Sequence, residues 1–132
     1  MEFQLTRFSR FSELPFDTFE LLDTSIYVLD FNWNYLFVNQ FVYKNLKATE
    51  SFVGKNMWET FPLLAIDPDF RLMKKNMEMN KATNIITISP LTGQRLSIIG
   101  YALEDCYFFS ASIMLNKEDL ISDLRKHLEK AS

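Results

Sequence analysis

Cysteine and histidine are almost absent from this 132-residue chain, which contains one of each, Cys106 and His127. A single cysteine excludes an intramolecular disulfide and a zinc site built on cysteine pairs, and it favours a reducing, cytoplasmic location. Nucleophilic cysteine chemistry needs a histidine within hydrogen-bond reach, but the two residues fall in different predicted elements. The sequence therefore contains no catalytic constellation and no metal site, and we do not expect an enzyme.

Strong net charge and long apolar runs are also missing. The chain has 14 basic and 17 acidic residues, a net charge of −3, and its basic residues are scattered, so we expect no nucleic-acid partner. No segment approaches the roughly 18 consecutive apolar residues of a membrane span. Polar and acidic residues interrupt the first dozen positions where a secretory signal would be apolar.

Bulky apolar side chains are abundant instead, with 13 phenylalanines, 6 methionines and a hydrophobic share of 48%. A chain of this length and composition can bury one core of its own. With only 3 glycines and 4 prolines and no internal repeat, we expect one domain without internal linkers. These side chains can either fill the interior or line a cavity in it.

The stretch from 26 to 39 predicts a β-hairpin. Strict alternation would place Ile26 and Val28 on one face of the first strand, and Leu36 and Val38 on one face of the second. Asparagine and aspartate between 30 and 34 favour the turn. Both faces of this hairpin are apolar, so we expect both to be covered.

Helical patterns precede and follow the hairpin. Asp17 and Glu20 have capping-box spacing for a short first helix, Asn39 is a plausible N-cap for a helix over 40–46, and a short apolar cluster spans 57–61. Asp67, followed by a proline, predicts the start of a longer helix to about residue 80. Its buried stripe would be Phe70, Met73 and Met77.

Three further strands are predicted over 84–89, 95–103 and 107–115, followed by an amphipathic helix in 116–132. The expected fold class is α+β: a five-stranded antiparallel, profilin-like sheet with helices inserted between its second and third strands. Helices at the N- and C-termini would flank this core.

This order resembles the PAS fold, and local motifs over residues 20–115 agree with it. The acidic hairpin Asp30–Asn34 followed by Phe37-Val38-Asn39 is similar to the family's first hairpin, and Val53–Pro62 and Thr92–Arg95 are similar to its later motifs. The chain departs from the family pattern at Trp33, where glycine is usual. It also has Met114-Leu115-Asn116 where an Asp-Ile-Thr exit is common.

The resemblance implies a sensory module that regulates an output domain, such as that of a sensor histidine kinase. We expect a flanking segment over 1–24, a PAS core over 25–115 and a signalling helix over 116–132. A small-molecule pocket, either open or filled, would lie under the helices. Its candidate walls are Val28, Leu36, Val38, Phe41, Met57, Trp58, Phe61, Phe70, Met73, Met77, Ile86, Ile88 and Phe109.

The chain lacks the residues to which the known cofactors of PAS domains attach. The resemblance would require a helical cysteine for a flavin adduct and a histidine on the long helix for haem, whereas Cys106 falls in a predicted turn and His127 in the predicted last helix. We therefore predict neither cofactor and leave an unidentified small ligand open.

Two alternatives remain beside the sensor. The module could be a ligand-free docking or dimerisation domain, or a small enzyme built on an open cavity, for which no polar dyad is visible. A homodimer would form through the flanking helices, and the candidate contacts are Phe16, Phe19, Leu22, Ile121, Leu124, Leu128 and Ala131.

Overall fold

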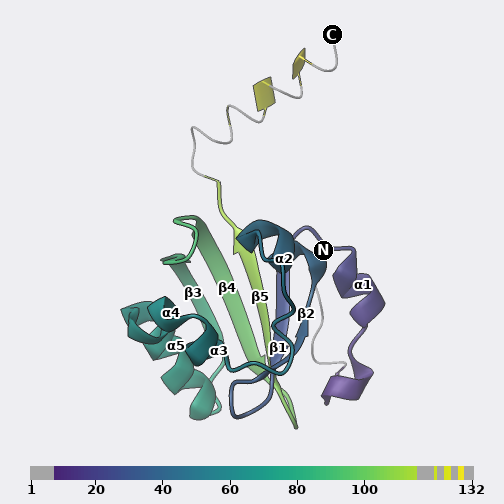
Figure 1. Cartoon of the computed structure of the whole chain (residues 1–132), viewed down its shortest axis with the longest axis vertical. Coiled ribbons are helices and arrows are strands. Elements are labelled where there is room, and N and C mark those ends of the chain that lie inside the picture. Colours follow the sequence, from purple (N-terminus) through teal and green to yellow (C-terminus); the bar gives the residue numbers. More distant parts are fainter. Residues whose placement is uncertain (1–7, 116–120, 122–123, 126–127, 130–132) are drawn as a thin grey trace.

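The computed structural model describes residues 8–115, 121, 124–125 and 128–129. Within these residues the strands form one antiparallel sheet in the order β2-β1-β5-β4-β3 (Figure 1). The strands are β1 (Ser25–Leu29), β2 (Tyr35–Val38), β3 (Thr83–Ile88), β4 (Arg95–Ala102) and β5 (Tyr107–Ile113). The expected α+β class, with helices inserted between the second and third strands, is confirmed.

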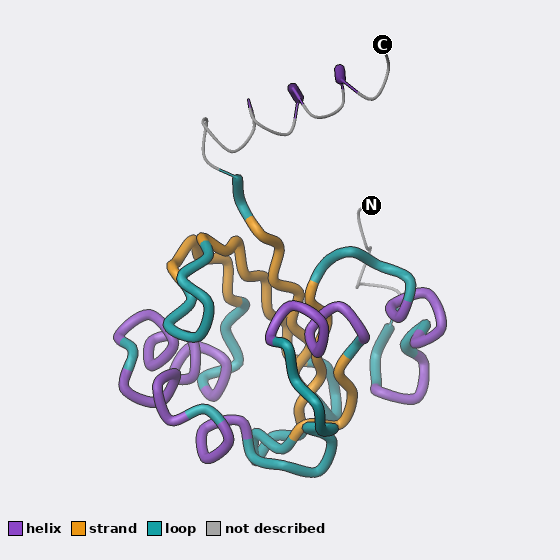
Figure 2. Tube along the Cα trace, turned by 45° about the horizontal axis from the view of Figure 1, so that its top comes forward, coloured by secondary structure: helices purple, strands orange, loops and turns teal. Residues whose placement is uncertain are grey.

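The inserted helices are α2 (Gln40–Leu46), α3 (Met57–Thr60), α4 (Pro62–Ile66) and α5 (Pro68–Glu78), and the N-terminal segment adds η2 (Phe11–Glu13) and α1 (Phe16–Glu20). In both views α1 lies on the other side of the strands from α3, α4 and α5 (Figure 1, Figure 2). The sheet is thus the middle layer, with a helical face and an outer face.

Capping residues explain where two of the helices begin. The side chain of Asn39 accepts a hydrogen bond from the backbone N–H of Val42, and that of Asp67 accepts two from the first turn of α5. Both caps confirm the prediction. The capping box predicted for the first helix is wrong, because Pro15 is the N-cap of α1 and no side chain caps it.

The helical face of the sheet holds the larger hydrophobic cluster. Its strand residues include Tyr27, Leu29, Ile98 and Phe109, which pack against the apolar sides of α2 to α5. The predicted stripe of α5, Phe70, Met73 and Met77, is buried to between 1 and 3% exposure. This stripe confirms the helical periodicity.

The outer face carries a second cluster over β1, β2 and β5. Leu14 and Phe19 of the N-terminal segment cover Ile26, Val28 and Phe108, and the rings of Phe19 and Phe108 lie 5.5 Å apart. The outer face of β3 and β4 has no such cover among the described residues.

A β-bulge in the first hairpin corrects the predicted faces of β2. Val28 pairs with Phe37 whereas Leu29 pairs with Tyr35, so Leu36 is the extra residue on its strand. The bulge shifts the alternation by one position. Tyr35 and Val38 therefore share the helical face, and Leu36 packs with the outer cluster.

The faces of β3 are the reverse of those predicted. Ile86 and Ile88 are 55% and 62% exposed on the outer face, whereas Thr83 and Thr87 are buried under α5. The Thr87 hydroxyl donates a hydrogen bond of 2.7 Å to the Asp69 carboxylate. Satisfied hydroxyls can be buried, so hydrophobicity alone assigned the wrong face.

Candidate functional site

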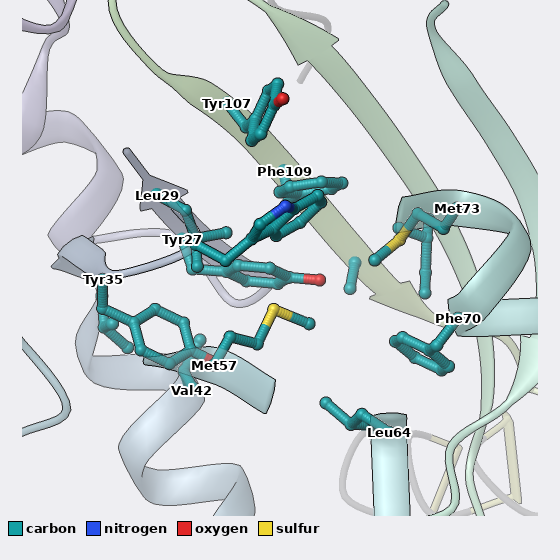
Figure 3. Packing of buried hydrophobic residues seen from close by; sticks show 14 of the residues in the cluster. Tyr27, Leu29, Tyr35, Val42, Met57, Leu64, Phe70, Met73, Tyr107 and Phe109 are labelled. Carbon is teal, nitrogen blue, oxygen red and sulfur yellow. The ribbon is translucent and has the colours of Figure 1, made fainter. Parts of the chain in front are cut away.

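A small cavity of about 70 Å³ lies between the helical face of the sheet and the helices. Its walls come from the helical face of the sheet, from α2 and α3, from the α4–α5 region and from the β3–β4 turn. The lining residues are Ser25, Tyr27, Tyr35, Val42, Asn45, Leu46, Met57, Phe61, Leu64, Phe70, Ser89, Leu91, Thr92, Leu96, Ile98 and Ala111. Figure 3 shows Tyr27, Tyr35, Met57, Leu64 and Phe70 converging on this region from different elements.

Two tyrosine hydroxyls are the only ionisable groups among the lining residues. Tyr27 on β1 and Tyr35 on β2 are 9% and 6% exposed, and their ring centroids lie 6.2 Å apart. Burial raises the pKa of both phenols well above the ordinary value, and for Tyr35 the neighbouring Tyr27 raises it further. Both are therefore neutral hydrogen-bond donors at physiological pH.

The polar end of the cavity lies at the β3–β4 turn. The Ser89 hydroxyl accepts hydrogen bonds from the backbone N–H groups of Leu91 and Thr92, at 3.1 and 3.3 Å. Gly93 has a φ of 74° in this turn, a conformation that glycine adopts without strain. The turn thereby holds Leu91 and Thr92 against the cavity.

The structure brings together only part of the predicted pocket. Met57, Phe61 and Phe70 line the cavity, while Val38, Met73, Met77 and Phe109 belong to the same buried cluster without lining it. Trp58 packs against that cluster from its edge, with its ring 5.1 Å from that of Trp33.

The remaining predicted wall residues lie elsewhere. Val28 and Leu36 pack on the outer face, Ile86 and Ile88 are exposed there, and Phe41 lines a shallow surface depression beside the α1–β1 connection. For Leu36 the β-bulge is the reason. For Val28, strand alternation itself points away from the helices, toward Phe19.

Sequence reasoning missed Tyr27, Tyr35, Leu64 and Ala111 as cavity residues. Tyr27 follows directly from alternation, since it is out of phase with Ile26 and Val28. Leu64 was missed because residues 62–66 were not expected to be helical, although Pro62 at the first position of α4 is a known start signal. Ala111 is too small to stand out in a search for bulky walls.

The predicted contacts of the flanking helices have different surroundings. Phe19 is fully buried, and Phe16 and Leu22 are partly buried against the sheet, with the ring of Phe16 4.8 Å from that of Phe37. This face of α1 therefore has an intramolecular partner. Ile121, Leu124 and Leu128 are 42%, 53% and 70% exposed, and Ala131 lies outside the described residues.

Cys106 is fully buried in the turn between β4 and β5. Burial first, and then a hydrogen bond and the nearby charge of Asp105, raise the pKa of its thiol to about 12. Asp105 and Glu104 also fasten the N-terminal segment: Asp105 accepts from the Phe11 N–H at 2.9 Å, and Glu104 pairs with Arg10 at 2.9 Å. Among the described residues no group of acidic, cysteine or histidine side chains could hold a metal ion.

No protein-family model matches the chain, and no curated protein matches it. Solved structures do. The chain is similar to the photoactive yellow protein domain of the sensor histidine kinase Ppr from Rhodospirillum centenum, with a TM-score of 0.59 and 15% identity over 76% of this chain and 94% of that one. It is also similar to the PAS domain of BvgS from Bordetella pertussis, with a TM-score of 0.57 and 15% identity over 87% of this chain and 94% of that one.

A third similar structure is the PAS domain of the quorum-sensing receptor RpfR from Cronobacter turicensis in complex with BDSF. The TM-score is 0.54 and the identity 12%, over 71% of this chain and 96% of that one. At such identities the likeness concerns the fold. The chain therefore has the PAS fold, as the sequence motifs indicated.

In the part of the chain that the structure describes, no helix combines the length and apolar character needed to cross a bilayer.

Proposed function

We propose that this chain is a sensory PAS module that binds a small molecule in its cavity and regulates an output domain, such as a histidine kinase. The observation that carries the proposal is the position of Ala111. This residue lines the cavity and lies on β5, which ends two residues later at Ile113 and leads to the C-terminal segment. A molecule in the cavity would therefore press on the strand that continues into that segment.

Similar structures support the signalling role. The neighbour from Rhodospirillum centenum is described as part of a sensor histidine kinase, and the neighbour from Cronobacter turicensis as a quorum-sensing receptor with a bound ligand. By analogy, the core over 25–115 would be the sensing part, and 116–132 would transmit its state. The buried thiol of Cys106 fits the reducing conditions of the cytoplasm.

We further propose that the module forms a homodimer through its C-terminal segment. Ile121, Leu124 and Leu128 repeat at spacings of three and four and are exposed, so a second copy could bury them. Light scattering over a concentration series should show association that Leu124→Gln weakens and the neighbouring Arg125→Gln does not. A wild-type monomer at every concentration contradicts the dimer.

A second candidate, a docking module without a ligand, is favoured by the uncovered half of the outer face. Ile86, Ile88, Ile99 and Tyr101 are between 37% and 62% exposed on β3 and β4, and strand pairing places them on one face. Such an apolar surface suits a partner protein.

Detection of a bound ligand distinguishes the sensory module from the docking module. Native mass spectrometry of the purified chain and thermal shifts against a metabolite panel should reveal a bound molecule or a stabilising compound. Ala111→Val is the control, because its two added methyl groups would occupy the cavity. This variant should retain no bound molecule and show no thermal shift with the compound. No co-purified molecule and no shift with any compound would favour docking.

A further inference from the structure

The two cavity tyrosines have polar ends without a protein partner. Tyr27 and Tyr35 are both more than nine-tenths buried and line the cavity, yet within the described part of the chain neither hydroxyl forms a hydrogen bond. By contrast, the Tyr43 hydroxyl accepts one from the Phe52 N–H at 3.1 Å. Neither hydroxyl oxygen is among the fully enclosed polar atoms without a partner, which are Glu20 Oε1, Trp33 Nε1 and Trp58 Nε1. Each hydroxyl therefore keeps some accessible surface, and an acceptor atom in the cavity could take its hydrogen bond.

The rest of the lining restricts the charge of that acceptor. No lysine, arginine, histidine, aspartate or glutamate lines the cavity. An ionised group would lose its hydration there without gaining a counter-ion, which is strongly unfavourable. Aliphatic and aromatic groups such as Met57, Ile98 and Phe70 instead favour the apolar body of an uncharged molecule.

Cavity size limits the molecule as well. The volume of about 70 Å³ is roughly half that of the ~150 Å³ apolar cavity known to take benzene. By the same ratio about three non-hydrogen atoms would fit as the side chains stand, so a molecule of about five such atoms requires a small shift of Met57 or Phe70.

We propose, on the basis of the small-molecule function above, that the cavity takes a small uncharged molecule whose carbonyl or similar oxygen accepts hydrogen bonds from Tyr27 and Tyr35. The two hydroxyls select for the acceptor oxygen, the apolar walls select against charge, and the volume selects for size. Tyr27 and Tyr35 would thus distinguish a ligand with an acceptor oxygen from a hydrocarbon of the same size.

Three probes of matched size test it: butan-2-one, its hydrocarbon isostere 2-methylbut-1-ene, and propionate. Binding is followed by NMR through the methyl signals of Met57 and Ile98. We expect butan-2-one to bind roughly tenfold more tightly than the alkene, because only the ketone pairs with the hydroxyls. Propionate should bind the most weakly.

Variants assign the difference to the tyrosines. Tyr27→Phe and Tyr35→Phe should each weaken butan-2-one binding about three- to tenfold and leave the alkene unchanged, without lowering thermal stability. Tyr107→Phe is the matched control, since Tyr107 is 5% exposed but does not line the cavity. Equal binding of ketone and alkene, preference for propionate, or no binding of any probe overturns the proposal.

Failure of this inference is distinguishable from failure of the proposed function. If a charged metabolite stabilises the chain and Ala111→Val abolishes that effect, the sensory function stands while the carbonyl ligand is excluded. If nothing in the metabolite panel acts and the probes do not bind, both fail.

Discussion

The side-chain amides of Asn45 and Gln94 form a reciprocal pair between α2 and the β3–β4 turn. Asn45 donates to Gln94 at 2.9 Å, and Gln94 donates back to Asn45 at 3.2 Å. Asn45 also lines the cavity, and the turn supplies Ser89, Leu91 and Thr92 to it. The pair therefore joins two sides of the cavity wall.

Breaking this pair should loosen the wall. In Gln94→Leu we expect faster amide hydrogen exchange in α2 and a loss of about 1 kcal/mol of stability, since Asn45 loses its partner. Gln40→Leu is the control, because Gln40 is exposed at the start of the same helix. Unchanged exchange in Gln94→Leu would mean that the pair does not hold α2.

Asn39 joins three elements through a fully buried side chain. Its oxygen accepts from the N–H groups of Ile26 and Val42, and its nitrogen donates to the carbonyls of Phe19 and Thr24 at 2.9 and 2.8 Å. All four bonds are shielded from water to different degrees, so their loss cannot be fully replaced by solvent.

Asn39→Ala should therefore lower the free energy of unfolding by about 3 kcal/mol or more, measured by chemical denaturation. Asn32→Ala in the exposed hairpin turn is the matched control and should change it by about 0.5 kcal/mol or less. Similar values for the two variants would contradict this role of Asn39.

Gly100 is required by close packing, not by an unusual backbone angle. A methyl group there would come within 2.6 Å of the Phe109 ring and 3.3 Å of the Met77 sulfur. Gly100→Ala should destabilise the chain by about 1–3 kcal/mol.

A double-mutant cycle checks the stated cause. Phe109→Leu removes the ring that the new methyl group would meet, so the two substitutions should be less destabilising together than their sum. If the destabilisation of the double variant equals the sum of the two single values, the clash with the Phe109 ring is not the cause of the Gly100→Ala effect.

Cys106 should make stability fall in alkaline solution. Its pKa is about 12 in the folded chain and near 9.0 in the unfolded chain, so above pH 9 only the unfolded state readily loses this proton. Below pH 9 the thiol is protonated in both states, so it should not make the free energy of unfolding depend on pH. Between pH 9 and 12 it should fall with a slope approaching about 1.4 kcal/mol per pH unit.

Chemical denaturation at several pH values measures this slope, and Cys106→Ala should flatten it between pH 9 and 10. Above pH 10, the raised pKa values of Tyr27 and Tyr35 add a decline of the same sign, which the cysteine substitution leaves in place. The same slope in Cys106→Ala and the wild type below pH 10 would contradict the assignment to the thiol.

The sequence predicted the elements more successfully than the faces of the strands. Asn39 and the Asp67-Pro68 pair marked helix starts because caps are local chemistry, and Phe70, Met73 and Met77 marked a buried helical face. Leu36 and Ile86 were misplaced because their orientation depends on a β-bulge and on which strand face the helices cover. Both are decided by tertiary packing, which local patterns do not contain.

Trp33 illustrates the same limit at the level of one residue. The sequence comparison with PAS hairpins pointed to glycine at this place, and the backbone indeed has a φ of 67° there. The side chain nevertheless is buried against Tyr107 and Trp58, with ring centroids 4.8 and 5.1 Å away. Its packing offsets a backbone conformation that is unfavourable for a non-glycine residue.

Coupling between the cavity and the chain beyond β5 is tested most directly by amide hydrogen exchange in Ala111→Val. Ala102→Val is the matched control, since Ala102 packs beside the same cluster on β4 without lining the cavity. We predict that filling the cavity changes exchange in β5 and in residues 116–128, and that the control variant, at a position that pairs with Tyr107 at the other end of β5, leaves residues 116–128 unchanged. A change confined to the cavity walls in Ala111→Val, with residues 116–128 identical to the wild type, would contradict the sensory mechanism.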